Sequence, residues 1–196
     1  MAPKRLGCFG GSFDPVHSGH LSLAQKAIQQ AHLDCLLLIP ARRNPHKTNP
    51  PKVTPEQRLA MLRCAIAGDA RLRVWAGELM APAPSYTIAT INQLKKHFPQ
   101  AELFWLMGAD SLAGLHRWHR IETLVRAVTF LILPRPGYAT MPSIPIPDLC
   151  LTQLDTPEIA VAATAIREHL AQGHPVSHLL PPAVHDYIVQ NNLYQT

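Results

Sequence analysis

The chain has 196 residues, of which 47% are hydrophobic and only 16% are charged. This balance excludes a disordered chain and predicts a single folded domain over residues 1–196, with a helical C-terminal segment from about residue 157. No apolar run approaches the roughly 20 residues that span a bilayer, and no signal-like stretch precedes Gly10. A cytoplasmic protein with no membrane partner is therefore expected.

The formal net charge is +5, and 11 histidines can add positive charge below pH 7. A positive balance favours anionic partners such as nucleotides. No nucleic-acid partner is expected, because the chain has no run of lysine and arginine and no basic patch interleaved with aromatic residues. Cys8, Cys35, Cys64 and Cys150 lack metal-ligand spacing, so we expect reduced, buried thiols and no metal site formed by the protein.

Strand and helix patterns alternate in the first half of the chain. Buried strands are predicted at 6–9, 35–39 and 72–75, and helices at 19–31 and from 55 to about 68. The first helix has an apolar face of Leu23, Ala24, Ala27, Ile28 and Ala31, and the second carries Leu59, Leu62, Cys64 and Ile66. Thr54 and Gln57 form a capping-box pattern before the second helix. Five prolines between residues 40 and 55 predict a long surface loop, and such loops tend to be functional.

The second half continues the alternation. Strands are predicted at 103–107, 128–133 and 149–154, and helices at 87–98, 121–126, 159–171 and 182–191. Ser85 is expected to cap the first of these helices, and a second proline-rich loop is expected at 134–147. The fold class is therefore α/β, with a doubly wound parallel sheet whose ligands bind at the carboxyl ends of the strands.

Residues 10–21 carry the strongest functional signal, the sequence Gly-Gly-Ser-Phe-Asp-Pro-Val-His-Ser-Gly-His-Leu. Gly10 and Gly11 have no Cβ atom, so a polyanion can approach the main chain closely. His17 and His20 stand at a predicted helix start, where main-chain N–H groups favour anions, and their spacing puts them on one face. The segment predicts a triphosphate site, although it lacks the Gly-Lys-Ser/Thr ending of a Walker A loop.

The pattern Gly-x-Phe-Asp-Pro-x-His-x-Gly-His resembles the nucleotidyltransferase superfamily with a His-x-Gly-His signature. Further segments occur in the order and spacing of one of its families: Asn44-Pro45-His46-Lys47, Ser85-Tyr86-Thr87-Ile88, Gly108-Ala109-Asp110, Trp118, Arg135-Pro136-Gly137, Thr164-Ala165-Ile166-Arg167 and the stretch 180–188. Over essentially the whole chain they resemble the bacterial nicotinate-nucleotide adenylyltransferases. The resemblance implies a Rossmann-like nucleotidyltransferase fold and an enzyme of NAD biosynthesis. That enzyme transfers the adenylyl group of ATP to nicotinate mononucleotide, with Mg²⁺ bridging the phosphates.

The same resemblance implies the site residues. The catalytic set is His17, His20, Lys47 and Arg167. The ATP-binding set is Gly10, Gly11, Ser12, Phe13, His17, His20, Asp110, Thr164 and Arg167, and the nicotinate nucleotide-binding set is Tyr86, Thr87 and Trp118. The chain departs from the family at two places: Ala162 and Ala163 replace two serines, and His119 replaces the tyrosine that often follows the tryptophan.

Each assignment has a plainer structural alternative. Lys47 is a loop cation that can fold over the β- and γ-phosphates, but a solvated lysine has the same pattern. Asp110 follows a strand, where carboxylates accept ribose hydroxyls, yet it can also cap the next helix. Trp118 can offer its ring face to a pyridine or pack in the core. Tyr86 and Thr87 can offer amides to a carboxylate or simply begin a helix.

Two other functions stay open at this point. One is another small-molecule adenylyltransferase of the phosphopantetheine type, although that family is shorter and lacks the Ser-Tyr-Thr and Trp118 arrangement. The other is a non-catalytic nucleotide sensor or nucleic-acid-binding protein, suggested by the basic composition and the missing serines. The intact His17, His20, Lys47 and Arg167 argue against it. The sequence predicts no particular number of subunits.

Overall fold

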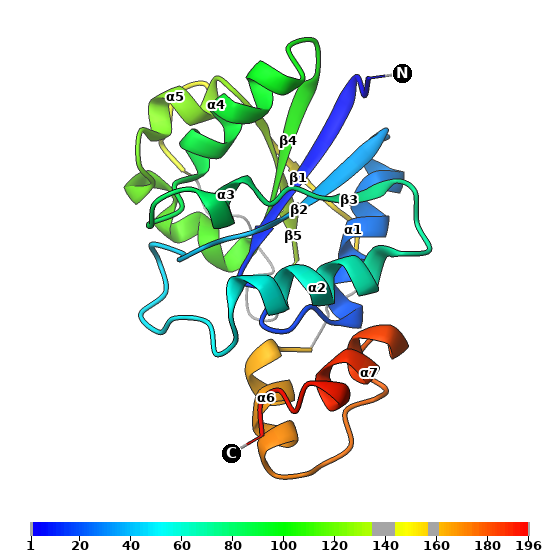
Figure 1. Cartoon of the computed structure of the whole chain (residues 1–196). Coiled ribbons are helices and arrows are strands. Elements are labelled where there is room, and N and C mark those ends of the chain that lie inside the picture. Colours follow the sequence, from blue (N-terminus) through cyan, green and yellow to red (C-terminus); the bar gives the residue numbers. More distant parts are fainter. Residues whose placement is uncertain (1, 135–143, 157–160, 196) are drawn as a thin grey trace.

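The computed structural model describes residues 2–134, 144–156 and 161–195, and in this part of the chain six strands form one sheet (Figure 1). All neighbouring strands pair in parallel, in the order β3-β2-β1-β4-β5-β6. The strands are β1 (Arg5–Gly11), β2 (Cys35–Pro40), β3 (Leu72–Val74), β4 (Glu102–Gly108), β5 (Thr129–Leu133) and β6 (Leu151–Gln153). The predicted doubly wound α/β fold is confirmed.

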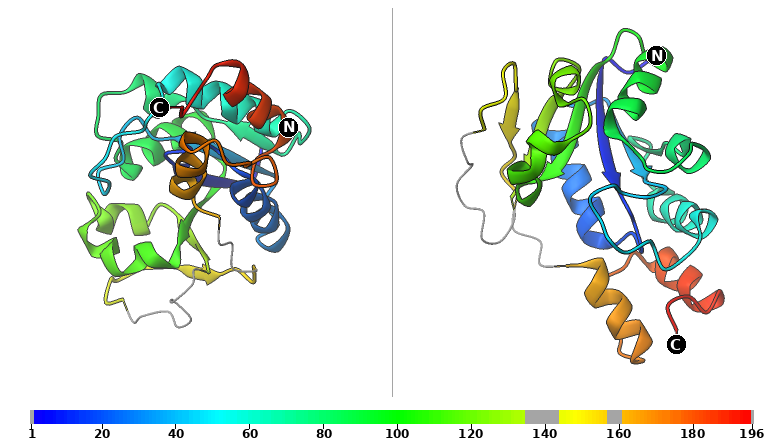
Figure 2. Two further views of the ribbon diagram at one scale, coloured as in Figure 1. Left: turned by 90° about the horizontal axis from the view of Figure 1, so that it is seen from below. Right: turned by 90° about the vertical axis from the view of Figure 1, so that its left-hand side faces the viewer.

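Helices connect the strands and continue past the sheet. They are α1 (Ser18–Gln30), α2 (Pro55–Ile66), α3 (Gly77–Met80), α4 (Thr87–His97), the 3₁₀ helix η1 (Ala109–Arg117), α5 (Ile121–Val125), α6 (Ala163–Ala171) and α7 (Pro182–Gln190). The helices α6 and α7 lie beyond the carboxyl ends of the strands, at the opposite end of the molecule from the N-terminus (Figures 1 and 2). The C-terminal segment therefore stands next to the sheet edge where ligands of this fold bind.

The two faces of the sheet carry separate apolar clusters. Leu23 of α1 and Leu62 of α2 belong to one buried cluster together with Leu38 of β2. Ile91 of α4 belongs to the other cluster, with Trp105 of β4 and residues of η1 and α5. Successive strand residues point to opposite faces, so each strand contributes to both clusters. Both faces are thus covered, as a parallel sheet requires.

The predicted elements are found to within a few residues, with three local exceptions. The short helix α3 was not expected, because four residues are too few for a periodic signal. The helix η1 begins at Ala109 after Gly108, so Asp110 lies in its first turn and is not its cap. The helix α6 begins at Ala163, four residues later than predicted. Residues 157–160, the Arg135-Pro136-Gly137 segment and most of the predicted loop 134–147 lie outside the described residues.

Ser85 does not cap α4, contrary to the sequence prediction. The N-cap is Tyr86, which makes no side-chain cap bond. The Ser85 hydroxyl instead accepts a hydrogen bond from Arg42 N at 3.0 Å, and Ser85 N donates to Arg43 O at 3.0 Å. Because these two bonds join the start of α4 to the loop after β2, tertiary pairing displaces the local cap.

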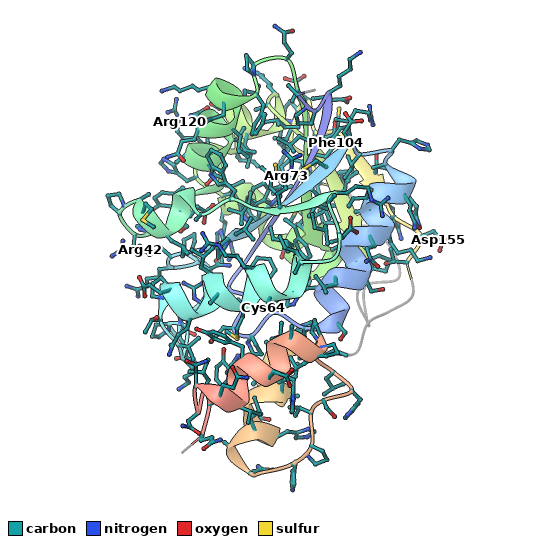
Figure 3. All side chains as sticks on the ribbon, turned by 45° about the vertical axis from the view of Figure 1, so that its right-hand side comes forward. Arg42, Cys64, Arg73, Phe104, Arg120 and Asp155 are labelled. Carbon is teal, nitrogen blue, oxygen red and sulfur yellow. The ribbon has the colours of Figure 1, made fainter. Side chains whose placement is uncertain are left out.

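The cysteine prediction is correct in part. The four cysteines are free thiols, and Cys8 and Cys35 are buried in β1 and β2. Cys64 is half-buried on α2, on the side that faces α7 (Figure 3), and Cys150 is exposed. The expectation of burial is therefore wrong for Cys150, which lies just before the short edge strand β6. In the part of the chain that the structure describes, no helix combines the length and the apolar character needed to cross a bilayer.

Arg58 is the least expected core residue. It is one of the buried residues of α2, together with Met61 and Leu62. Of the residues that the sequence placed on the apolar face of this helix, Leu59, Cys64 and Ile66 are only half-buried. The Arg58 side chain is 1% exposed, and its Nη1 donates to Ser12 O and to Ala41 O, both at 2.7 Å. Ser12 follows β1 and Ala41 follows β2, so one guanidinium joins the ends of two neighbouring strands.

Replacing Arg58 with Met is expected to lower the free energy of unfolding by about 3 kcal/mol. Hydrogen bonds from charged donors contribute about 1.5–3 kcal/mol each, and the carbonyls of Ala41, which is buried, and of Ser12, which is partly buried, would lose their donor. The urea midpoint should fall with the m-value unchanged. Arg63→Met is the control, because Arg63 is exposed on the same helix and its loss should change stability by no more than about 0.5 kcal/mol. Equal effects of the two substitutions would contradict the role given to Arg58.

Candidate active site

A pocket of about 680 Å³ lies at the carboxyl ends of β1 and β4. The chain order of the strands reverses between these two neighbours, which is where doubly wound folds bind ligands. Every site residue predicted from the sequence lines this one pocket: Gly10, Gly11, Ser12, Phe13, His17, His20, Lys47, Tyr86, Thr87, Asp110, Trp118, Thr164 and Arg167. Segments from Gly10 to Arg167 are thus brought together, and the volume suits a nucleotide-sized ligand.

The two histidines stand in one stack at the start of α1. His17 is the N-cap of the helix and is 5% exposed, and His20 is the third helical residue. Their ring centroids are 3.7 Å apart with an angle of 31° between the planes. His17 N donates to His20 Nδ1 at 3.3 Å. Because Nδ1 accepts this bond, the neutral His20 ring carries its proton on Nε2, which makes that atom a donor.

The glycines of the motif have a packing role that the sequence did not show. A Cβ atom on Gly10 would lie 2.7 Å from the Trp105 ring, and one on Gly11 would lie 3.0 Å from the Phe13 ring. Phe13 is 2% exposed, and its ring meets His20 edge to face at 5.0 Å. Small residues at these positions therefore let two aromatic rings close in behind the turn, and one of them supports His20.

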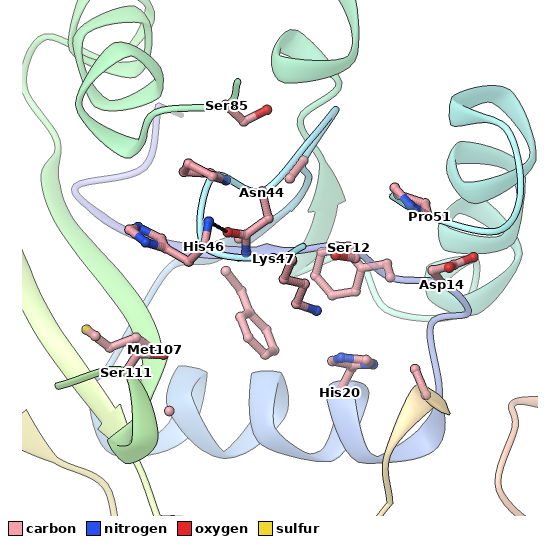
Figure 4. Close-up of a pocket in the computed structure, with 18 of the residues that line it drawn as sticks. Ser12, Asp14, His20, Asn44, His46, Lys47, Pro51, Ser85, Met107 and Ser111 are labelled. Carbon is pink, nitrogen blue, oxygen red and sulfur yellow. Dashed lines mark hydrogen bonds between the residues drawn. The ribbon is translucent and has the colours of Figure 1, made fainter. Parts of the chain in front are cut away.

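Lys47 projects from the loop after β2 into the pocket, on the side of His20 (Figure 4). The loop bends locally, because Asn44 Oδ1 accepts from His46 N at 2.8 Å and Lys47 N donates to Asn44 O at 3.2 Å. This tight bend fixes the root of the lysine while its side chain stays exposed. The expected loop cation is thus in reach of an anion bound at the start of α1.

The start of α6 forms the facing wall. Ala162 is its N-cap and makes no side-chain cap bond. The main-chain amides of the first turn are therefore not capped by a hydroxyl of the N-cap residue and can bind an anion in the pocket. Thr164 and Arg167 lie one turn apart, and Arg167 Nη2 donates to Thr164 Oγ1 at 3.1 Å. Arg167 Nη1 also donates to Asp14 O at 2.7 Å. The arginine is therefore anchored at two points with its head group at the pocket.

Four rings gather at the other end of the pocket. His46 stacks on Trp118 with centroids 5.6 Å apart and an angle of 21°, and His119 lies 4.5 Å from Tyr86. Trp118 is half-buried, and its ring meets that of Phe130 in a T-shaped arrangement. A further ring between His46 and Trp118 would need about 7 Å, twice the usual contact distance, so the loop ring must shift to admit one. Sequence reasoning missed His46, although the residue stands beside Lys47 in a motif that it had singled out.

A buried acid holds the ring end in place. Glu78 is 8% exposed on α3 and accepts hydrogen bonds from Thr90 Oγ1, at 2.5 Å, and from the Ser85 hydroxyl. Burial raises the pKa of Glu78, and the two hydrogen bonds partly offset that increase. The unpredicted helix α3 thus positions Ser85, and through it the start of α4 where Tyr86 and Thr87 face the pocket.

Within the described residues, no three His, Cys, Asp or Glu side chains are close enough to hold a metal ion. The carboxylates that line the pocket belong to Asp14, Glu78 and Asp110. Asp14 and Glu78 are buried, whereas Asp110 is exposed. This donor set suits a cation that keeps several waters and takes most of its other ligands from a bound polyphosphate.

Comparison with known proteins points to one family. Residues 8–169 match the Cytidylyltransferase-like family model. The chain is 34% identical over 193 residues to the nicotinate-nucleotide adenylyltransferase of Bacillus subtilis, covering 98% of this chain and 100% of the relative. It is 38% identical, with the same coverage, to a Bacillus pumilus protein named "Probable nicotinate-nucleotide adenylyltransferase". The fold is similar to that of Plasmodium falciparum nicotinic acid mononucleotide adenylyltransferase complexed with NaAD, with a TM-score of 0.75, 19% identity and 97% of each chain covered.

The His46 ring should titrate below the usual histidine pKa of about 6.5. Burial lowers the pKa of His46, and the positive charge of Arg117 lowers it further. Arg117→Gln removes the second cause only, so the pKa should rise but stay below the usual value. NMR titration of the His46 ring protons in both proteins tests this, with Arg120→Gln as the matched control. A pKa at or above the usual value in the unmodified protein would contradict the position of the ring, stacked on Trp118 and close to Arg117.

Proposed function

This chain belongs to the Cytidylyltransferase-like family and, within it, to the nicotinate-nucleotide adenylyltransferases, and we propose that it adenylylates nicotinate mononucleotide with ATP. The products are nicotinate adenine dinucleotide and pyrophosphate, a step of NAD biosynthesis. The observation that carries the proposal is the single pocket, which joins a cationic phosphate end, with His17, His20, Lys47 and Arg167, to an aromatic end with Trp118.

The reaction needs positioned donors more than a nucleophile from the protein. A phosphate oxygen of nicotinate mononucleotide attacks the α-phosphorus of ATP, the bond to the β-phosphate oxygen breaks, and pyrophosphate leaves with the electron pair. Negative charge grows on the equatorial oxygens and on the leaving group. His20 Nε2 carries a proton in the geometry described above and can donate to this charge. Lys47 and Arg167 line the same pocket as the start of α1 and suit the β- and γ-phosphates.

Mg²⁺ is proposed as the cation that accompanies ATP. It neutralises phosphate charge when bound, and magnesium typically takes one or two carboxylates beside substrate phosphates and water. Asp110 is the exposed carboxylate of the pocket and is placed to contribute, directly or through water, in addition to its proposed contact with the ribose. The protein is proposed to hold no other metal.

Nicotinate is proposed to bind at the ring end of the pocket. Tyr86 and Thr87 occupy the N-cap and the first position of α4, where main-chain amides point away from the helix. These amides suit the two oxygens of the nicotinate carboxylate, and Trp118 offers a ring face to the pyridine. His46 stacks on that tryptophan in this structure, so the nicotinate ring displaces it or shares the face.

The comparisons favour this activity over the phosphopantetheine type and over a non-catalytic sensor, since the relatives are named for it along their full length. The single-domain organisation and the cytoplasmic location stay predictions. Absence of nucleic acid and membrane from the set of partners is likewise proposed from the composition.

The enzyme is expected to prefer the substrate that carries a carboxylate over the one that carries an amide. In a pyrophosphate-release assay with Mg²⁺-ATP, kcat/KM for nicotinate mononucleotide should exceed that for nicotinamide mononucleotide by about a hundredfold or more. A charge-assisted hydrogen bond contributes about 1.5–3 kcal/mol, and an amide NH₂ facing a main-chain donor leaves that donor unpaired at a cost of about 1–3 kcal/mol. Phosphopantetheine is included as the third substrate. Equal efficiencies for the two nucleotides would show that the pocket does not recognise the carboxylate, and turnover of phosphopantetheine alone would refute the proposed substrate.

Removal of the His20 imidazole tests the phosphate end. His20→Ala should lower kcat about a hundredfold, equivalent to ~3 kcal/mol, with a smaller change in KM, because the donor acts mainly on charge that develops during the reaction. His178→Ala is the control, since His178 is exposed and does not line the pocket. A near-normal kcat for His20→Ala would rule out the proposed role.

A further inference from the structure

Asp14, inside the glycine-histidine motif, is a junction of three distant segments. Its side chain is 6% exposed, and Oδ2 accepts from Lys52 N of the loop after β2 at 2.8 Å. Oδ1 accepts from the Tyr194 hydroxyl at 2.8 Å. Arg167 Nη1 lies 3.8 Å from Oδ2 while it donates to Asp14 O. One buried carboxylate therefore lies next to the loop after β2, the C-terminal segment and Arg167, the arginine that is proposed to bind the phosphates of ATP.

Tyr194 is brought to this carboxylate by a turn that follows α7. Asn192 and Tyr194 have positive φ angles of 49° and 65°, and Leu193 between them is buried in the core. The turn directs the phenol back under the motif. A second bond fixes the same region, because Ser18 N at the start of α1 donates to Leu179 O at 3.0 Å. The C-terminal segment is thus tied to both ends of the turn that carries the histidines.

The phenol is a permanent donor to Asp14. Burial raises the pKa of Tyr194, and the negative charge of Asp14 raises it further, so the hydroxyl keeps its proton at any physiological pH. With the Tyr194 hydroxyl on one oxygen and Lys52 N on the other, each Asp14 oxygen has a close donor. The Arg167 head group then stays at an intermediate distance and keeps its Nη2 bond to Thr164.

Without the phenol, Asp14 Oδ1 would lose its donor, and Arg167 Nη1 already lies 3.8 Å from the other oxygen, Oδ2, of the same carboxylate. Unsatisfied buried charge is costly, so the guanidinium would close the gap to a direct ion pair. A guanidinium in a close pair with Asp14 would offer less charge to a phosphate. We propose that Tyr194 is a positioning residue for the triphosphate site, which satisfies Asp14 so that Arg167 remains directed toward ATP. The inference rests on the proposed function only in assigning Arg167 to the phosphates.

Calorimetric titration of Mg²⁺-ATP, without nicotinate mononucleotide, tests the inference on the intact protein. Tyr194→Phe keeps the ring and removes the hydroxyl, and it should raise the Kd for ATP about tenfold, the effect of one weakened charged contact. The KM for nicotinate mononucleotide should change by less than about twofold, since the ring end of the pocket is untouched. Tyr187→Phe is the matched control. It removes the hydroxyl of another tyrosine, on α7, whose ring packs against the same core.

A double-mutant cycle separates positioning from simple support of the fold. In the Asp14→Asn background, Tyr194→Phe should change the ATP Kd by less than about twofold, because a neutral amide does not attract Arg167. An unchanged Kd for Tyr194→Phe, an equal loss for both substrates, or the same tenfold loss in the Asp14→Asn background would overturn the inference. If the unmodified protein neither binds ATP nor turns over nicotinate mononucleotide, the proposed function fails, and this inference fails with it.

Discussion

The buried guanidinium of Arg58 is the contact on which the rest of the site depends. Parallel strands end at a common edge, and the segments that leave them carry carbonyls with no partner in the sheet. Ser12 O and Ala41 O are two such groups, and Arg58 donates to both at 2.7 Å. A second bond, from Ala41 N to Gly11 O at 2.8 Å, closes the same junction. The turn that carries the histidines and the loop that carries the lysine are therefore held at one fixed spacing.

The charge balance of the pocket depends on the burial and the hydrogen bonding of its acidic side chains. The side chain of Asp14 is satisfied by a phenol and a main-chain amide, and Glu78 is buried with a raised pKa. Their negative charge is largely screened from a ligand. His20, Lys47 and the first-turn amides of α1 and α6 then give this end of the pocket a net positive potential, which suits the proposed polyphosphate ligand. Adenylyl transfer depends on such fixed donors, since they are oriented before the charge develops.

The C-terminal helices, which lie beyond the sheet, also support the pocket. Apolar residues of α7, such as Val184 and Ile188, share a buried cluster with Val16 of the motif and with residues of α2. The glycine-histidine turn is therefore packed from behind by a segment that lies far away in the sequence. The same segment supplies Arg167 from α6, so it both packs behind the histidine turn and forms the facing wall of the pocket.

Much of the fold followed from local patterns in the chain. Apolar runs and helical periodicity located the strands and most helices, because burial on a parallel sheet imposes those patterns directly on the sequence. The four-residue helix α3 and the start of α6 left no such pattern. Ser85 shows why helix caps are harder to assign from sequence. Its hydroxyl could cap α4 locally, but in the structure it accepts a hydrogen bond from the main-chain amide of Arg42, on another segment.

The sequence by itself determined most of the residues of the candidate site, since the motifs and the resemblance named thirteen positions that all line one pocket, although His46 was missed. Only the tertiary structure decided what holds them there. Arg58, Glu78 and Tyr194 carry no motif of their own, and their partners Ala41, Ser85 and Asp14 lie on other segments. The physical reason is that a buried charge or hydroxyl is placed by long-range pairing, which depends on how the chain packs and leaves no periodic pattern in the sequence.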